Sequence, residues 1–316
     1  MSLLSIIVPC YNEEESIRTF YEEFISVYKN SIINYNSKMR YELIFVNDGS
    51  KDNTLKLLKE LASKDENVKY ISFSRNFGKE SALYAGLKNS SGDYVAVMDV
   101  DLQDPPSLLS EMIKTLDQED YDIIATRRVS RKGEPPIRSF FARLFYNMFN
   151  KISNVELVDG ARDYRLMTRQ VIDAILDLSE SNRFSKGIFS WVGFNTKWLE
   201  YKNIERSGGE TSWSFRGLFK YAIEGVIAFT TVPLVISTVL GMAISIISFL
   251  YLIYIVLSTI FFGNDVPGWT STVSIILLLG GIQLLSIGIL GQYLGKTYIE
   301  TKNRPIYITK ETNIKK

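Results

Sequence analysis

Two long apolar segments lie towards the carboxyl end of the chain. The first runs from Thr231 to Phe262 and the second from Thr270 to Leu294. At about 1.5 Å of rise per residue, a helix over either segment exceeds the roughly 20 residues that cross the hydrocarbon core of a bilayer. Residues 263–269 between them contain Asn, Asp, Pro and two glycines, which is turn chemistry. The pattern predicts two transmembrane helices joined by a short loop. The alternative is a pair of buried helices in a large soluble protein.

The amino-terminal part of the chain alternates between short apolar segments and amphipathic ones. Apolar segments typical of buried strands cover residues 4–8, 41–47, 68–72, 94–99 and 121–126, whereas residues 13–28 and 54–62 are amphipathic. This alternation predicts an α/β fold in which helices cover a parallel sheet. Ligands of such sheets bind at the carboxyl ends of the strands, so we expect the functional site at that edge.

The charges around the apolar segments predict their orientation. Between Glu224 and Lys296 the only charged residue is Asp265, which lies in the loop. Arg216 and Lys220 precede the pair of segments, and six basic residues follow it before the C-terminus. The positive-inside rule therefore places both ends of the pair in the cytoplasm. We expect a multi-pass protein of the inner or plasma membrane, with its soluble domain and both termini cytoplasmic.

These patterns divide the chain into six predicted parts. They are a cytoplasmic domain (1–213), an amphipathic juxtamembrane helix (214–230), two transmembrane helices (231–262 and 270–295), an extracytoplasmic loop (263–269) and a cytoplasmic tail (296–316). Residues 138–149 form a second amphipathic segment, rich in aromatic residues. Each amphipathic segment fits the headgroup layer of a membrane, and an ordinary core-facing helix is the alternative.

Small residues on the second apolar segment bear on assembly. They are Gly280, Gly281, Gly288 and Gly291, which permit close packing between helices. We therefore expect a homo-oligomer, for which a tetramer is one candidate.

Composition excludes several kinds of chemistry. The 316 residues include no His and a single Cys, Cys10. A Ser-His-Asp triad, a His general base, a His-ligated zinc site and an internal disulfide are therefore all excluded, which leaves acid-base work to carboxylates. With 36 Lys and Arg against 35 Asp and Glu, the net charge is +1, which argues against a nucleic-acid partner.

Acidic residues follow the apolar segment at 94–99. Asp99 and Asp101 are two apart in an extended stretch, so their side chains point the same way, and Gln103 is next in the series. Two carboxylates and an amide oxygen suit Mg²⁺ or Mn²⁺, which neutralises a diphosphate. Capping of the following helix is the alternative, and for Asp104, directly before Pro105, we favour the cap.

Glycine-rich phosphate loops of the familiar kinds are absent from the sequence. No Gly-x-Gly-x-x-Gly follows a predicted strand, and no Walker lysine motif occurs. A dinucleotide-dependent enzyme and a P-loop ATPase are therefore not expected. Asp48-Gly49-Ser50, after the predicted strand at 41–47, is either ordinary turn chemistry or part of a ligand site.

Four blocks, taken together, resemble the family 2 glycosyltransferases of GT-A fold. They are Ile6-Ile7-Val8-Pro9-Cys10-Tyr11-Asn12-Glu13-Glu14, Val46-Asn47-Asp48-Gly49-Ser50, Ser74-Arg75-Asn76-Phe77-Gly78-Lys79-Glu80 and Asp99-Val100-Asp101-Leu102-Gln103-Asp104-Pro105-Pro106. Within that family, the chain is most similar to the polyprenyl-phosphate glycosyltransferases, which include dolichol-phosphate mannose synthase and the bacterial undecaprenyl-phosphate glucosyltransferases. The resemblance covers nearly the whole chain, including the two apolar segments.

The resemblance implies roles on the donor side of the site. Asp99 would lie near the ribose and the metal, with Asp101 and Gln103 holding the metal against the diphosphate. Arg127 would contact phosphate, and Arg206 begins a segment that closes over the donor diphosphate, in which Ser212 replaces the family's usual Lys or Arg. The nucleotide base and ribose would be lined by Pro9, Tyr11, Glu13 and Asp48.

The resemblance also implies roles on the acceptor side. Asp163 occupies the block of the catalytic carboxylate, and Arg165 would contact the acceptor phosphate. Because a phosphate monoester has its second pKa near about 6, the nucleophile is already ionised at neutral pH. Asp163 could therefore orient the acceptor or remove a last proton, and we favour orientation.

The implied activity is that of a polyprenyl-phosphate hexosyltransferase. It would transfer a sugar, with UDP-glucose as the expected donor, to undecaprenyl phosphate with inversion at the anomeric carbon, for glycosylation of the cell envelope. UDP-GlcNAc, UDP-galactose and GDP-mannose are alternative donors. A processive polysaccharide synthase is disfavoured because the sequence has no Gln-x-x-Arg-Trp block. A non-catalytic membrane scaffold is the alternative from another class.

Overall fold

The computed structural model of the protein describes residues 2–128, 145–153, 155–178, 180–201, 222–223, 225–262 and 268–315. The described residues divide into two compact units. One comprises Met1–Gly225 together with Arg304–Lys316, and the other comprises Val226–Asn303.

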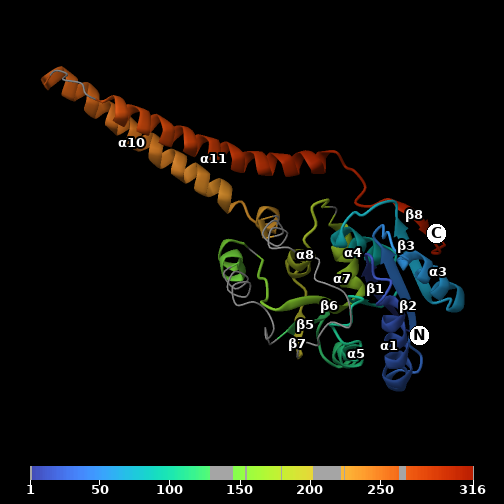
Figure 1. The fold of residues 1–316 in the computed structure, drawn as a ribbon. Coiled ribbons are helices and arrows are strands. Elements are labelled where there is room, and N and C mark those ends of the chain that lie inside the picture. The colour runs from blue at the N-terminus through green and yellow to red at the C-terminus, as the bar shows by residue number, and fades with distance from the viewer. Residues whose placement is uncertain are drawn as a thin grey trace. The chain divides into compact units, whose positions relative to one another are not determined.

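The first unit is built on an eight-stranded sheet (Figure 1). Its strands are β1 (Leu3–Cys10), β2 (Arg40–Asn47), β3 (Val68–Phe73), β4 (Tyr94–Val97), β5 (Ile123–Arg128), β6 (Ala161–Thr168), β7 (Thr196–Tyr201) and β8 (Thr309–Thr312). They are ordered β7-β5-β6-β4-β1-β2-β3-β8. The five strands expected from apolar segments are confirmed, with ends shifted by one or two residues.

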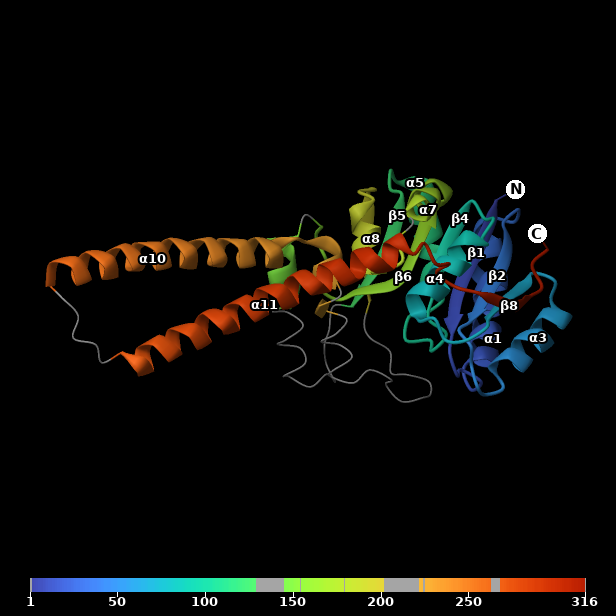
Figure 2. The ribbon, with the colours of Figure 1, turned by 90° about the horizontal axis from the view of Figure 1, so that it is seen from above.

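The sheet is mixed, whereas the sequence predicts a parallel one. Strands β1, β2, β3 and β4 are mutually parallel, as Figure 2 shows for β1 and β2. In contrast, β6 runs antiparallel to both β4 and β5, and β8 runs antiparallel to β3. The antiparallel direction of β6 matters for the site, because it brings the start of β6 to the edge where β4 ends.

Helices cover both faces of the sheet. On one face lie α1 (Ile17–Val27), α3 (Thr54–Lys64) and α5 (Leu108–Gln118), whose apolar stripes join the main core. A π-helical segment, η1 (Tyr28–Ile32), and a short α2 (Ile33–Tyr35) extend α1. The other face is covered by α4 (Lys79–Lys88), α7 (Arg169–Asp177) and α8 (Ser185–Trp191). The contact of α4 with β1 is so close that a Cβ on Gly86 would lie 2.1 Å from a methyl carbon of Ile7.

The second unit contains two long helices, α10 (Val232–Phe262) and α11 (Trp269–Thr301). Each contains a segment of 24 residues that is long and apolar enough to cross a membrane. Large apolar side chains on both are exposed, for example Phe261 at 73% and Leu284 at 72%. Within this chain they are therefore not the buried helices of a soluble core. Helix α11 continues past the predicted end at residue 295 to Thr301, and the tail that follows contains β8.

Candidate active site

The predicted site residues gather at one edge of the sheet. Strands β1, β2, β3 and β4 all end there, and β6 begins there. Val97 is paired with Arg165 in the antiparallel register of β4 and β6. Continuing that register by two residues along each chain brings Asp99 beside Asp163, although 64 positions separate them in the sequence.

The loop after β3 is held by Asp48. One oxygen of the Asp48 carboxylate accepts a hydrogen bond from the backbone N–H of Phe77 at 2.6 Å, and the other accepts one from Gly78 at 2.9 Å. Burial raises the pKa of Asp48, and these two hydrogen bonds oppose that rise. At the adjacent Gly49, with φ of +69°, a Cβ would lie only 2.4 Å from the backbone carbon of Arg75. Asp48 and Gly49 therefore fix the loop that leads into α4.

Lys79, the first residue of α4, joins the two central carboxylates. Its Nζ lies 2.7 Å from Asp99 Oδ1 and 2.7 Å from Asp163 Oδ2. The side chain of Lys79 is 39% exposed, while those of Asp99 and Asp163 are 25% and 18% exposed. Lys79 lies within one of the four family blocks, but no role is predicted for it from the sequence. The available signal was its position, because a basic residue directly after Gly78 begins a helix at the ligand edge.

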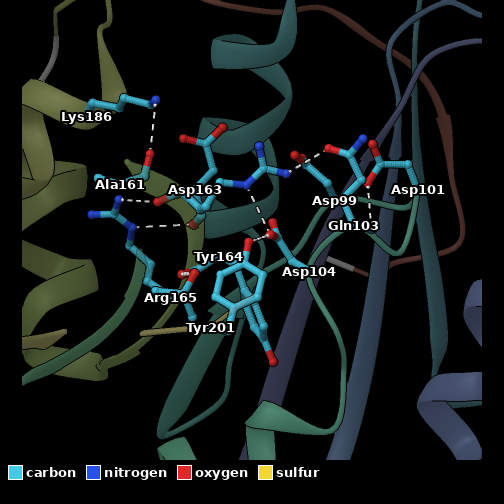
Figure 3. Close-up of polar contacts among 12 residues, drawn as sticks. Asp99, Asp101, Gln103, Asp104, Ala161, Asp163, Tyr164, Arg165, Lys186 and Tyr201 are labelled. Carbon is cyan, nitrogen blue, oxygen red and sulfur yellow. Dashed lines mark hydrogen bonds and ion pairs between the residues drawn. The ribbon is translucent and has the colours of Figure 1, made fainter. Parts of the chain in front are cut away.

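Positive charges surround Asp163. Burial alone would raise its pKa, but the charges of Lys79 and Lys186 outweigh burial and hold the pKa well below its usual range. Lys186, on α8, also donates a hydrogen bond to the carbonyl of Ala161 at 3.2 Å (Figure 3). The site therefore keeps Asp163 ionised.

Arg165, the predicted acceptor-phosphate residue, already has several contacts. Its Nη2 donates to the carbonyl of Arg162 at 2.9 Å, and its Nε donates to the carbonyl of Asp163 at 3.4 Å. The guanidinium carbon lies 3.8 Å from the centroid of the Phe189 ring. Burial lowers the pKa of Arg165 to about 10, so it remains charged at neutral pH. Two of its five N–H donors are used in these hydrogen bonds.

The loop after β4 is stabilised by Arg162. Its Nη2 donates to Gln103 Oε1 at 3.1 Å, and its Nε pairs with Asp104 Oδ1 at 3.0 Å. Gln103 N–H in turn donates to Asp101 Oδ1 at 3.2 Å, and Tyr201 donates to the fully buried Asp104 (Figure 3). The expectation that Asp104 caps the next helix is wrong. A turn at Pro106 and Ser107 intervenes, and α5 begins only at Leu108.

The pair Asp99 and Asp101 fits a divalent cation that arrives with a diphosphate. No group of three or more His, Cys, Asp or Glu residues able to hold a metal occurs among the described residues. Mg²⁺ is commonly bound through one or two carboxylates plus substrate phosphates rather than by a cage made wholly of protein. Gln103 Oε1 accepts from Arg162, and ionised carboxylates bind a hard cation more strongly than a neutral amide oxygen does, so Asp99 and Asp101 would be the better ligands here.

The remaining donor-side residues occupy the end of β1 and its loop. Pro9 pairs with Val46 in the sheet, and the ring of Tyr11 is 44% exposed. Asn12, with φ of +55°, links this loop to the next one, because its Oδ1 accepts from Lys51 N–H at 2.9 Å. The N–H of Glu13 donates to the hydroxyl of Thr54 at 2.9 Å.

Arg127, one of the two predicted phosphate-binding arginines, does not join the cluster of Lys79, Asp99 and Asp163. Arg127 lies at the correct edge, near the start of β6, but its guanidinium pairs with Glu200 on the neighbouring strand β7. Arg206 lies outside the described residues, as do the positions of the segment it begins. Their predicted roles therefore remain predictions.

Comparison with known proteins gives consistent matches. Residues 5–176 match the model of the family described as "Glycosyl transferase family 2". The putative glycosyltransferase CsbB of Bacillus subtilis (strain 168) is 46% identical over 312 residues, which are 99% of this chain and 92% of that protein. The bactoprenol glucosyl transferase of Shigella phage SfV is 41% identical over 309 residues, which are 97% of this chain and 98% of that protein.

A solved structure is similar to part of the chain. It is glucosyl-3-phosphoglycerate synthase from Mycobacterium tuberculosis in complex with Mn²⁺, uridine diphosphate and phosphoglyceric acid. The similarity has a TM-score of 0.46 at 16% identity and covers 72% of this chain and 76% of that one.

Proposed function

The chain belongs to glycosyl transferase family 2, and we propose that it transfers glucose from UDP-glucose to undecaprenyl phosphate. The observation that carries this proposal is the 41% identity, over nearly the whole of both chains, to the bactoprenol glucosyl transferase of Shigella phage SfV. That match covers 97% of this chain and so includes the two helices that are long and apolar enough to span a membrane. Such helices would hold the catalytic unit beside a lipid acceptor. The product would be a polyprenyl-phosphate sugar for the cell envelope.

The proposed reaction is one in-line displacement. A phosphate oxygen of the acceptor attacks the anomeric carbon, the bond from that carbon to the diphosphate oxygen breaks, and UDP leaves with the bonding electrons. The acceptor phosphate is largely dianionic at neutral pH because its second pKa is about 6. It therefore needs orientation more than deprotonation, and orientation of reactants is itself a large source of rate.

Asp163 suits the role of a positioning carboxylate. The low pKa imposed by Lys79 and Lys186 makes it a weak base. Its 2.7 Å contact with Lys79 ties it to the donor-side residue Asp99. We propose that the two ion pairs of Lys79, with Asp99 and with Asp163, set the spacing between the donor and acceptor subsites.

Lys186 is the better candidate for direct contact with the acceptor phosphate. It is partly exposed and donates one described hydrogen bond, to Ala161, whereas the Arg165 guanidinium is buried and makes several contacts. Both line a narrow pocket whose other walls are Tyr146, Leu157, Val158, Ala161, Ser190 and Trp198.

Asp99 and Asp101 would hold Mg²⁺ or Mn²⁺ on the donor side. A bound cation supplies charge neutralisation for the departing diphosphate. Removal of divalent cations with excess EDTA should abolish transfer, and Asp101→Asn should lower the affinity for Mn²⁺ measured by calorimetry in the presence of UDP. Full activity in EDTA would contradict the assignment.

We also propose the membrane arrangement predicted from charge. The catalytic unit and both termini would face the cytoplasm, where nucleotide sugars are made, and α10 and α11 would span the membrane. Assembly into a homo-oligomer through the glycine-containing part of α11 stays a prediction of the sequence.

A lipid-transfer assay tests the proposed function. Membranes containing the full-length protein are incubated with undecaprenyl phosphate and labelled UDP-glucose, UDP-GlcNAc, UDP-galactose or GDP-mannose in parallel. We expect label in the butanol-extractable lipid from UDP-glucose, and loss of that label with Asp163→Asn. Asp120→Asn, an exposed change, serves as the matched control. Labelling from another sugar alone would replace glucose, and no labelling from any donor would refute the proposal.

A further inference from the structure

The segment that follows the second long helix is part of the catalytic unit. Strand β8 pairs antiparallel with β3 at the edge of the sheet (Figure 1). The Asn313 side chain continues this pairing, because its Oδ1 accepts from Tyr70 N–H at 2.8 Å and its Nδ2 donates to the carbonyl of Val68 at 3.0 Å. Glu311 pairs with Lys59 of α3 at 2.7 Å. We call residues 304–313 the C-terminal strap.

Tyr307 of the strap packs into an aromatic cluster. Its ring stacks on Phe73, with centroids 4.9 Å apart and an interplanar angle of 22°. Phe73 in turn meets Phe77 edge to face at 5.7 Å, and Tyr84 of α4 meets Tyr307 at 6.3 Å. The Tyr307 hydroxyl also accepts a hydrogen bond from Asn89 Nδ2 at 3.3 Å.

These contacts flank the loop that carries Lys79 to the carboxylates. The strap holds the end of β3, where Ser74 N–H donates to the carbonyl of Ile308 at 3.0 Å. Beyond the loop, Tyr307 holds α4 through Tyr84. Between the end of β3 and α4, Asp48 holds the loop by accepting hydrogen bonds from the N–H groups of Phe77 and Gly78. The strap therefore supports the end of β3 and the middle of α4, and Asp48 fixes the loop between them.

We propose that the C-terminal strap is a positioning element of the active site, with Tyr307 as its central residue. It contacts neither central carboxylate in the described structure but supports the loop and helix that place Lys79 between them. The segment after the second apolar helix is then required for the geometry of the site, and not only as a polar tail.

Hydrogen exchange of the full-length protein in detergent tests this directly. In Tyr307→Ala, amides of residues 74–79 should exchange at least about tenfold faster than in the parent protein. Amides of the buried strand β1 should keep their rates. Ile308→Ala is the matched control, because the Ile308 side chain is 52% exposed and its carbonyl is retained. Unchanged exchange at 74–79 in a folded Tyr307→Ala protein would overturn the proposal.

Steady-state kinetics supply a second readout. Tyr307→Ala should lower kcat by about tenfold or more while changing the KM for the nucleotide sugar by less than about threefold. Tyr307→Phe, which keeps the ring and loses only the hydroxyl contact, should restore kcat to within about threefold of the parent.

A second variant covers the case in which Tyr307→Ala does not fold. Tyr307→Leu keeps apolar volume without a flat ring, and the same exchange and kinetic changes are expected. Full kcat in a folded Tyr307→Leu or Tyr307→Ala protein would refute a positioning role. A fall in kcat that only follows the folded fraction would also refute it, since that is the behaviour of a purely structural residue.

Discussion

Removing the charge of Lys79 is the sharpest test of the site geometry. Lys79→Met keeps most of the side-chain stem but leaves Asp99 and Asp163 without the ammonium group that lies 2.7 Å from each. The two carboxylates then repel each other, and Asp163 on the acceptor side is no longer linked through Lys79 to Asp99 on the donor side. We expect a folded protein with a large loss of activity.

The size of the loss can be worked out from the two contacts. Hydrogen bonds to charged groups contribute about 1.5–3 kcal/mol each. Because the Lys79 side chain is 39% exposed, solvent screening reduces their sum to about 2–3 kcal/mol. At about 1.4 kcal/mol per factor of ten, kcat/KM should fall by about 30- to 150-fold.

The assay is glucose transfer to undecaprenyl phosphate across a range of pH, with thermal unfolding measured in parallel. Lys79→Arg should recover part of the rate, whereas Lys88→Met, an exposed change at the other end of α4, should leave it unchanged. Since Lys79 is the strongest of the charges that lower the pKa of Asp163, its loss should move the acid limb of the pH profile to higher pH. A folded Lys79→Met protein that keeps more than half of its kcat/KM would refute the reasoning.

Three further outcomes follow from the described contacts and the charge pattern. Asp163→Asn should lose activity equally at pH 6 and pH 8 in the transfer assay, since a depressed pKa leaves the carboxylate ionised at both; a larger loss at pH 6 would indicate a base instead. Asp104→Asn should lower the melting temperature by roughly 5–10 °C in a thermal scan, because it removes the charge of a buried ion pair worth a few kcal/mol. In a variant without Cys10, a cysteine at Asn264 should react with an impermeant maleimide added to intact cells, and one at Lys315 should not; the reverse pattern would overturn the topology.

The ion pair between Lys79 and Asp163 also determines how the stability of the fold depends on pH. The folded-state pKa of Asp163 is depressed, so its contribution is present above the unfolded value of about 4 and is lost as pH falls through the folded value. The folded-state pKa of Lys79 is raised, so its contribution is present below about 10 and is lost only as pH rises through the folded value. The pair therefore stabilises the fold throughout the neutral range.

The predictable parts of the fold are the elements whose burial requires a continuous run of apolar residues, because such a run is visible in the sequence. Strands β1 to β5 are apolar because both faces of the central sheet are covered, so they appear as continuous apolar segments. Asp99 and Asp101 could be placed because they directly follow one of these strands. The two long helices were equally predictable, since each is a long segment of almost uninterrupted apolar residues in the sequence.

The parts that were missed depend on contacts between distant residues. Strand β6 contains Arg162, Asp163 and Arg165, and its buried Arg165 is explained only by stacking on Phe189 and by carbonyl partners. Strand β8 is Thr-Lys-Glu-Thr, with no apolar alternation, and its pairing relies on Asn313 and on an edge strand more than 200 residues away. The local pattern of apolar and polar residues therefore predicts neither β6 nor β8.

The charge balance at the ligand edge supports the need for a divalent cation. The described central residues supply four carboxylates, Asp99, Asp101, Asp163 and Glu80, and the adjacent cations are Lys79, Lys186 and Arg165. Asp104 balances Arg162, and Glu200 balances Arg127, so neither arginine adds net positive charge. A nucleotide diphosphate and a lipid phosphate would then bring about four negative charges into a group of side chains that has no excess of positive charge. Bringing them within bonding distance requires added positive charge, and Asp99 and Asp101 lie where a divalent cation could supply half of it.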